Sequence, residues 1–371
     1  MANGPISGDA DVRAEAIAIL SDMVSSRREI LCSLLGLAAA PAVAAEPFDL
    51  RLYQPYQKRA TVKGVLRLWG HGSFRRDFMG RLVKRWFAEF QTHYPAVELD
   101  YRMYGTASAV GALYSGRGNL ALLGEEVSPD AARAFLRARG YAPTVIPVAT
   151  GSLDANFFDY AHMIFVHRDN PLRQLSLTAL DAIFGAEHRR GRRNVRSWGE
   201  LGLAGDWAKR RIQPYGWKVD EDFALFFRER VLLDSHRWNN DLREFVHVTR
   251  NDGSQYDHGQ QILDALANDR YGIAISNVRY QVPPVRPIAL AWRPGGKYVL
   301  ASQASLIDQS YPLARIIPAV IDRAPGAPIE PVVREFLRYL LSREGQQAML
   351  DNSDYLPISP VVATREQRKL R

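Results

Sequence analysis

Hydroxyl side chains at two turns are the groups of this sequence whose type and spacing suggest chemistry. Ser73 follows an apolar segment at residues 66–69, and Thr106 and Ser108 follow a second such segment at residues 97–103. Each turn leads into a helical pattern, and the unpaired N–H groups and positive dipole end of a helix start attract anions. Two such turns at one sheet edge predict an anion-binding site without a full positive charge. Ordinary helix capping by the same hydroxyls is the alternative interpretation.

Signatures of catalysis and of metal binding are absent from the sequence. It contains no Gly-x-Ser-x-Gly elbow, Walker loop, Gly-x-Gly-x-x-Gly or His-Glu-x-x-His motif. The eight histidines include no pair at metal-ligand spacing on one expected helix, so neither a metal nor a cofactor is expected. Glu125 and Glu126 are adjacent, and adjacent strand residues point to opposite faces, so they cannot form a facing acid pair. A secreted hydrolase that uses Ser73 or Ser108 with His71 is an alternative, but no recognisable triad accompanies these residues, and we predict a binding protein rather than an enzyme.

The segments that must position these turns alternate between strand and helix patterns. Apolar residues recur at helical spacing over residues 74–90, and a third strand pattern at 119–124 precedes a helix that starts at Ser128. This order predicts an α/β fold built from βαβ units with mostly parallel sheets. Further strands are expected at residues 163–166, 271–276 and 313–321, and further helices at 177–184, 222–232, 259–267 and 331–341.

Residues 185–220 are rich in Arg, Gly and Trp and are predicted to form a long surface segment. They include a basic cluster formed by Arg189, Arg190, Arg192, Arg193 and Arg196. The whole chain has 48 Lys and Arg residues against 40 Asp and Glu, a formal charge of +8 that favours anionic partners. No aromatic interleaving or nucleic-acid motif accompanies the cluster. We therefore interpret it as a solvated loop and expect no nucleic-acid partner.

The N-terminus has the three parts of an export signal. Arg27 and Arg28 precede an apolar run at residues 31–40 that is too short to span a bilayer, and Ala42-Val43-Ala44 follows as a cleavage site. Paired arginines ahead of an apolar residue are typical of twin-arginine signals. We expect residues 1–44 to be an N-terminal extension and signal peptide, cleaved after Ala44, and the mature chain to lie in the periplasm. A buried N-terminal helix is the alternative.

Composition narrows the class of protein further. Among the 371 residues, 47% are hydrophobic and 24% are charged, which is typical of a soluble globular protein and not of a disordered one. The single cysteine, Cys32, lies inside the expected signal. It excludes a disulfide within the chain, a cysteine-based zinc site and an iron–sulfur cluster.

The order of these patterns resembles the phosphate-binding proteins of bacterial ABC transporters, within the type II periplasmic substrate-binding superfamily. The resemblance covers roughly residues 64–360, and no one of its motifs is specific alone. It is carried by Gly72-Ser73-Phe74, Tyr104-Gly105-Thr106-Ala107-Ser108, Val166-His167-Arg168-Asp169-Asn170-Pro171-Leu172 with residues 177–185, Gly272-Ile273-Ala274, Ser342-Arg343-Glu344-Gly345-Gln346-Gln347 and Tyr355-Leu356-Pro357-Ile358.

The resemblance implies a two-lobed fold in which each lobe is a mostly parallel sheet flanked by helices. Lobe 1 is expected at residues 46–155 plus 285–371, and lobe 2 at residues 156–284. Two crossover strands would join the lobes and allow them to close around a ligand.

The resemblance also implies a ligand site at the strand ends. Its candidate residues are Gly72, Ser73, Phe74, Thr106, Ala107, Ser108, Glu125, Trp217 and Lys218. Phosphate-binding members carry an arginine and a Ser-Gly-Thr turn before a helix of lobe 2, whereas Trp217-Lys218 stands at that place here. The acidic residues that follow, up to Asp222, would repel an anion. An alternative alignment uses Arg250-Asn251-Asp252-Gly253-Ser254.

The function that the resemblance implies is capture of a small oxyanion, above all phosphate, for an ABC transporter. The hydroxyls at the two turns would donate hydrogen bonds, Lys218 would supply charge, and Glu125 would accept a proton from a monohydrogen species. The expected partners are an inorganic or organic anion and a transporter permease or another membrane partner, and a monomer is expected. The alternative is the same fold used as a sensor or partner-binding protein without phosphate binding.

Overall fold

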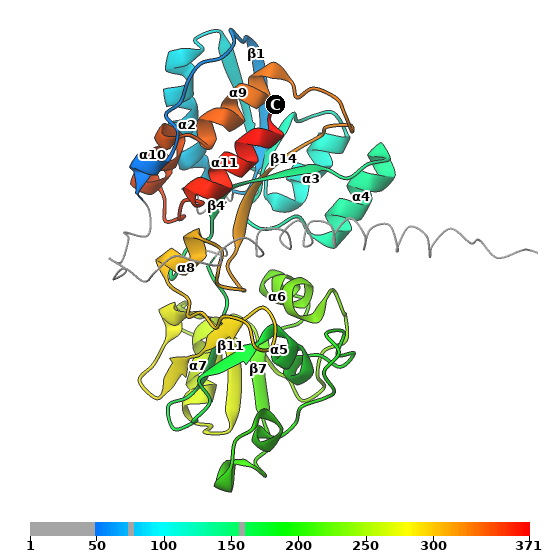
Figure 1. Ribbon diagram of the computed structural model, residues 1–371, viewed down its shortest axis with the longest axis vertical. Coiled ribbons are helices and arrows are strands. Elements are labelled where there is room, and N and C mark those ends of the chain that lie inside the picture. Colours follow the sequence, from blue (N-terminus) through cyan, green and yellow to red (C-terminus); the bar gives the residue numbers. More distant parts are fainter. Residues whose placement is uncertain (1–48, 73–77, 156–159) are drawn as a thin grey trace, which may run out of the picture.

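The computed structural model describes residues 49–72, 78–155 and 160–371, which form two lobes joined by two connections (Figure 1). The expected export signal and cleavage site lie outside the described residues. Within these residues, no helix is both long and apolar enough to cross a membrane.

The first lobe contains a five-stranded sheet in the order β2-β1-β3-β14-β4. β1 runs parallel to β2 and β3, whereas β14 runs antiparallel to β3 and β4. The strands are β1 (Gly64–Gly70), β2 (Val97–Arg102), β3 (Leu120–Leu122), β4 (Thr144–Thr150) and β14 (Ile316–Ile321).

Helices cover both faces of this sheet. α2, α9, α10 and α11 enclose one core with Leu120 and Leu122, while α3 and α4 enclose another with Ala121 and Leu123. This division follows from the alternation of side chains along β3. Trp86 of α2 is fully buried, and its indole donates a hydrogen bond to the carbonyl of Gly345 in α10 (2.7 Å). The helices are α2 (Phe78–His93), α3 (Thr106–Tyr114), α4 (Pro129–Arg139), α9 (Pro331–Leu340), α10 (Arg343–Asn352) and α11 (Pro360–Lys369), and the 3-10 turn η2 spans Leu50–Leu52.

The second lobe contains a five-stranded sheet in the order β12-β5-β11-β7-β8. β11 and β8 run parallel to β7, whereas β5 is antiparallel to both of its neighbours. Every residue of β11 is buried, as expected for a strand covered on both faces. The strands of this sheet are β5 (Met163–His167), β7 (Gln213–Trp217), β8 (Arg243–Phe245), β11 (Gly272–Ser276) and β12 (Val285–Pro287). Two further sheets have two strands each: β6 (Gln174–Ser176) with β13 (Ala289–Ala291), and β9 (Val248–Thr249) with β10 (Gln255–Tyr256).

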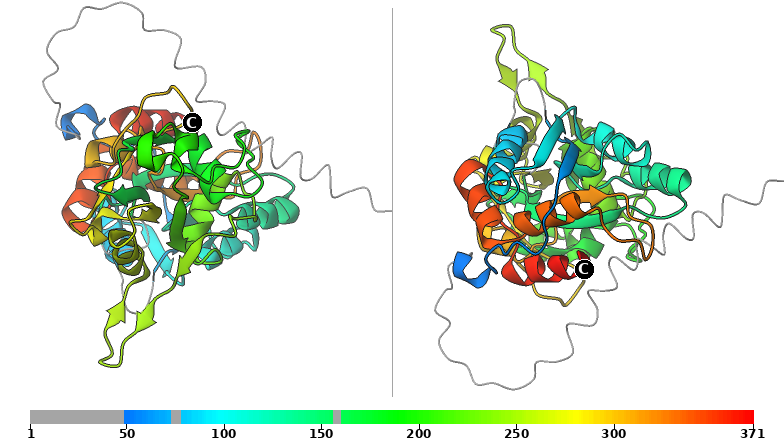
Figure 2. Two further views of the ribbon diagram at one scale, coloured as in Figure 1. Left: turned by 90° about the horizontal axis from the view of Figure 1, so that it is seen from below. Right: turned by 90° about the horizontal axis from the view of Figure 1, so that it is seen from above.

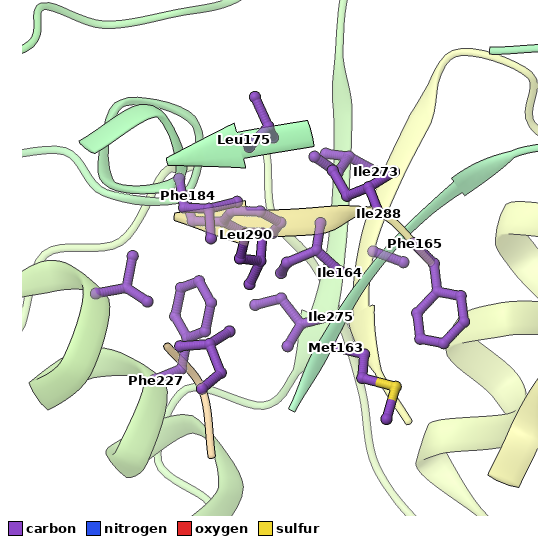
Figure 3. Close-up of a cluster of buried hydrophobic side chains, with 14 of the residues drawn as sticks. Met163, Ile164, Phe165, Leu175, Phe184, Phe227, Ile273, Ile275, Ile288 and Leu290 are labelled. Carbon is purple, nitrogen blue, oxygen red and sulfur yellow. The ribbon is translucent and has the colours of Figure 1, made fainter. Parts of the chain in front are cut away.

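The core of the second lobe joins its sheet to α5 and α6. Phe184 of α5 and Phe227 of α6 meet edge to face at 5.4 Å, close to Ile164 and Ile275 from the sheet (Figure 3). The Oγ of Ser176 accepts the N–H of Ala179 and caps α5, as its sequence pattern predicts. The helices are α5 (Leu177–Phe184), α6 (Asp222–Leu232), α7 (His258–Ala267) and α8 (Gln303–Ile307), with 3-10 turns η3 (Trp198–Leu201), η4 (Gly205–Trp207) and η5 (Val278–Tyr280).

The predicted surface segment at residues 185–220 is wrong over part of its length. It contains β7, which lies between β11 and β8 in the second sheet. Trp198 is fully buried and Trp217 is 2% exposed, so the segment contributes to the core. Pro214 of β7 lies one residue before the pairing with β8 begins at Tyr215, so its missing N–H removes no bond to that strand.

The expected return to lobe 1 at residue 285 is also wrong. β12 pairs with β5 in the second sheet, and residues 306–314 contribute to the second core. The chain rejoins the first sheet at β14. The two connections lie side by side, since the N–H of Gly151 donates to the carbonyl of Arg315 (3.2 Å) and that of His162 to Leu313 (3.3 Å). The two crossover strands implied by the resemblance correspond to these hydrogen-bonded segments.

Candidate functional site

The strand ends of the first lobe bring three loops together. The N–H of His71 donates to the carbonyl of Leu122 (2.9 Å), so the segments after β1 and β3 are joined. Thr106, the first residue of α3, lies between them. Its Oγ1 accepts the N–H of Gly124 (3.2 Å) and lies 3.2 Å from Nδ1 of His71. Burial and the charge of Arg315 lower the pKa of His71.

The other predicted residues of these loops make local contacts. The hydroxyl of Ser108 donates to the carbonyl of Gly105 (2.8 Å), the N-cap of α3, whose helix start has no side-chain cap. Gly105 has a φ of +108°, a conformation that favours glycine, and it lets the chain turn into α3. Gly72 lies so close to Met103 that a Cβ would stand 2.8 Å from its side chain, and Ala107 is exposed. Ser73 and Phe74 lie outside the described residues.

A buried arginine, which the sequence analysis missed, lies where the second connection enters β14. Arg315 is 2% exposed, and its guanidinium lies 2.9 Å from a carboxylate oxygen of Glu126 and 3.6 Å from one of Glu125. The other oxygen of Glu126 accepts the N–H of Ile316 (2.7 Å). The expectation that the two glutamates point apart is wrong, because β3 ends at Leu122 and both lie in the following turn. A lone arginine in an apolar strand pattern is the sequence signal that could have identified this charge.

The strand ends of the second lobe hold buried polar groups of a different kind. Trp217 ends β7, and its ring centroid lies 4.5 Å from that of His162. Among the described residues, the indole N–H of Trp217 and both ring nitrogens of His162 have no hydrogen-bond partner. The same holds for the hydroxyl of Ser152, which lies in the first connection, just after β4. Burial, above all, holds the pKa of His162 well below its usual range, so this imidazole is neutral. Unpaired buried donors are the kind of group that a polar ligand satisfies.

The charge expected from Lys218 is partly neutralised. Its Nζ lies 3.0 Å from a carboxylate oxygen of Asp220, a contact that raises the pKa of the exposed ammonium. The helix that follows begins with acidic residues, because Glu221 is the N-cap of α6 and Asp222 is its first residue. The alternative segment, residues 250–254, forms the turn between β9 and β10, on a hairpin that projects from the lobe (Figure 2).

Helix α6 brings the second lobe against the first (Figure 1). The ring of Phe226 lies 4.4 Å from the guanidinium carbon of Arg315, a cation–π contact between the lobes. At the far end of the helix, Arg133 of α4 lies 3.8 Å from a carboxylate oxygen of Asp234. Between these contacts, burial, followed by the charge of Glu126, raises the pKa of Glu229 to about 8.

A basic cavity of about 500 Å³ lies elsewhere in the first lobe, around α9 and α11. Five arginines contribute to its lining: Arg59, Arg334, Arg338, Arg368 and Arg371. None of the site residues predicted from the sequence lines this cavity. Its positive lining makes it a second candidate place for an anion, so experiments on the strand ends need a control at this cavity.

Comparison with known proteins adds a close relative and a shared fold. The chain is 31% identical over 336 residues to the phosphate-binding protein PstS of Pseudomonas aeruginosa, in strains PAO1 and UCBPP-PA14. This alignment covers 90% of the chain and 95% of the relative. PstS from Borrelia burgdorferi, a solved structure, superimposes with a TM-score of 0.53 at 9% identity, over 80% of this chain and all of that one, and so shares the fold. No protein-family model matches the chain.

Proposed function

The chain belongs to the family of PstS phosphate-binding proteins, and from this premise we propose that it binds phosphate between its lobes for an ABC transporter. The observation that carries the proposal is the 31% identity to PstS along nearly the whole chain. We further propose that the protein works in the periplasm as a monomer, delivers its ligand to a transporter permease and performs no catalysis.

The structure supports a site at the facing strand ends. The first lobe offers the N–H groups of Thr106 and Ala107 at the start of α3, beside Gly72 and Ser108. The N–H of Ser108 itself donates to the carbonyl of Gly105 (3.1 Å). The second lobe offers Trp217 and the positive end of the Lys218 side chain. We add His162 and Ser152 to this set, because their polar atoms are buried without a partner among the described residues. Phosphate accepts hydrogen bonds at four oxygens, so neutral donors from both lobes suit it.

The proposed role of Glu125 changes with the structure. Its carboxylate lies 3.6 Å from the guanidinium of Arg315 and forms an ion pair with it. We propose that this pair adjusts the charge beside the ligand, and that Glu125 accepts the proton of a monohydrogen phosphate only in the closed form. Closure about the two connections would bring the groups of both lobes onto one ligand.

Thermal unfolding in the presence of phosphate tests the proposal. A ligand that binds only the folded state adds about 2.7 kcal/mol of stability at a hundredfold excess over its Kd. Phosphate is expected to raise the unfolding midpoint, and sulfate at the same concentration is the comparison. Trp217→Phe removes the indole N–H and retains an aromatic ring, so it is expected to reduce the phosphate shift. Trp207→Phe, a partly buried tryptophan outside the proposed site, is its matched control.

A variant of the basic cavity separates the two anion-binding places. If Arg368→Gln abolishes the phosphate shift and Trp217→Phe leaves it unchanged, the cavity is the phosphate site and the proposed location is wrong. No shift with phosphate or any other anion would favour the alternative of a sensor or partner-binding protein. This second candidate is favoured by the acidic residues at the start of α6, because they would repel an anion.

A further inference from the structure

Two histidines and an aspartate meet at the base of the hairpin formed by β9 and β10. The hairpin pairs Val248 with Tyr256, which places the residues one step further out, His247 and Asp257, at the open end of the ladder. Nδ1 of His247 lies 3.6 Å from a carboxylate oxygen of Asp257. The ring of His258 stacks on that of His247 with a centroid separation of 3.9 Å. One ligand atom from each of the three residues lies within 4.8 Å of the other two.

The neighbouring helix holds these three side chains in place. The side-chain amide of Gln261 in α7 donates to the carbonyls of Val246 (2.6 Å) and Tyr256 (2.8 Å), and so fixes the residues just before His247 and Asp257. A second oxygen of Asp257 accepts the N–H of Gly259 (2.8 Å) at the start of α7. The positions of the three residues are therefore fixed by the pairing of β9 with β10 and by hydrogen bonds to α7.

A carboxylate orients the buried histidine in the way that metal ligands are commonly oriented. Nδ1 of His258 lies 2.9 Å from an oxygen of Glu221, the N-cap of α6. Its Nε2 then faces Asp257, at 4.0 Å from the nearer oxygen. Metal-bound histidines usually give their second ring nitrogen to a carboxylate, which fixes the tautomer and strengthens the ligand.

The spacing of the cluster is close to that of a metal site. Bonds of about 2.0–2.1 Å at tetrahedral angles place ligand atoms about 3.3 Å apart. The separations of 3.6 and 4.0 Å involve different oxygens of Asp257, and the three ligand atoms all lie within 4.8 Å of one another, so binding requires them to move closer. The two stacked imidazoles must also turn relative to one another, and the His247 side chain, 41% exposed, has room to do so.

We propose that His247, Asp257 and His258 bind one divalent transition-metal ion such as Zn²⁺, with Glu221 as a positioning residue. Two imidazoles and a carboxylate select zinc, copper or nickel over magnesium or calcium, which prefer oxygen ligands only. A bound cation would also offset the negative charge of Glu221 and Asp257 beside the proposed phosphate site. The inference goes beyond phosphate binding and stands without it.

The test is zinc titration of the full chain, prepared without a polyhistidine tag, stripped with a chelator and kept free of phosphate. Competition with a metal-sensitive dye is expected to show one high-affinity Zn²⁺ per chain. His247→Ala is expected to weaken binding at least about tenfold, because it removes one of three protein ligands. His236→Ala is the matched control, because His236 is also exposed and lies 4.0 Å from a carboxylate, that of Asp234. Glu221→Gln is expected to weaken binding about 10- to 100-fold.

Two results would overturn the proposal. One is a wild-type chain that takes no Zn²⁺ from the dye. The other is equal affinity in wild type and His247→Ala. Co²⁺ provides a second measurement, since tetrahedral coordination gives an intense visible absorption that must be present in wild type and in His236→Ala, and lost in His247→Ala. The unfolding midpoint of each metal-free variant shows that the loss does not come from misfolding.

Discussion

The strand ends of the two lobes differ in how their buried polar side chains are satisfied. In the first lobe, Thr106 accepts a backbone N–H, and Arg315 contacts two carboxylates. In the second lobe, His162 and the indole N–H of Trp217 are buried without partners among the described residues. Removing one partner of a satisfied pair leaves the other buried and unpaired, which is costly, whereas removing an unpaired group is not.

This contrast indicates a division of roles between the lobes. In the first lobe, the hydrogen bonds of His71 and Thr106 join the segments after β1 and β3. The second lobe retains unpaired donors that a ligand would satisfy. These donors lower the stability of the protein when no ligand is bound. Variants at the first-lobe strand ends should therefore mainly change stability, and variants at the second-lobe strand ends should mainly change ligand binding.

The largest effect is expected from Arg315, because its charge is buried and paired. Arg315→Met leaves Glu126 without its cation and is expected to lower the free energy of unfolding by about 3–5 kcal/mol in urea denaturation. The triple variant that also carries Glu125→Gln and Glu126→Gln removes the stranded charges and should recover part of the loss. An effect below 1 kcal/mol in the single variant would mean that the charge of Arg315 is screened by solvent, although its side chain is 2% exposed.

Glu229, between the lobes, is expected to make stability fall as pH rises. Burial, with the charge of Glu126 nearby, raises its pKa from 4.5 to about 8, so the folded state holds a proton that the unfolded state releases. The contribution of Glu229 to stability is then fully present below pH 4.5 and is lost as pH rises through about 8, by at most about 1.4 kcal/mol per pH unit. Glu229→Gln mimics the protonated acid, so its advantage over wild type should grow from pH 5 to pH 8.

Urea unfolding of both proteins at several pH values measures this difference. Glu98→Gln, at an exposed position of β2, is the control and should show no such trend. A constant difference between wild type and Glu229→Gln across this range would show that Glu229 is ionised in the folded protein.

His162 should have the opposite pH dependence. Its pKa is depressed by burial, so the unfolded state binds a proton below pH 6.5 that the folded state excludes. The contribution of His162 to stability is present above pH 6.5 and is lost as pH falls, by at most about 1.4 kcal/mol per pH unit. His162→Phe retains the ring contacts with Trp217 and removes the titration, so its unfolding midpoint relative to wild type should rise between pH 7 and pH 5. The exposed His236→Phe should not change the slope.

Local sequence signals predicted much of the fold. The helices at residues 177–184 and 222–232 are confirmed with those bounds, because apolar spacing and flanking polar residues define them. β7 was missed because Pro214 and Gly216 disfavour a strand, and its place in the sheet depends on pairing with distant β11 and β8. The lobe boundary was misplaced because a Pro-Pro break at residue 283 does not reveal that the next strand pairs backward with β5.

The sites were harder to predict than the elements. The pairing of Glu126 with Arg315 joins residues 189 positions apart, and no local pattern encodes it. His247 and His258 were judged by helical spacing, whereas a hairpin register brings them together. The roles of the candidate residues at the two turns stay predictions. The hydroxyl of Ser108 donates within its own turn, to the carbonyl of Gly105.

The smallest expected effect comes from a direct comparison of one residue in each lobe. Thr106→Val removes a hydroxyl that accepts the N–H of Gly124, and it should lower the free energy of unfolding by about 1–2 kcal/mol. Trp217→Phe removes an indole N–H that has no partner among the described residues, so beyond the loss of ring volume it should cost less. The ligand should reverse this order, because saturating phosphate must stabilise Thr106→Val more than Trp217→Phe if the second lobe supplies the free donors. Differential scanning calorimetry measures the stability of the two variants with and without phosphate. If the same variant is the more stable in both conditions, the proposed division of roles between the lobes is wrong.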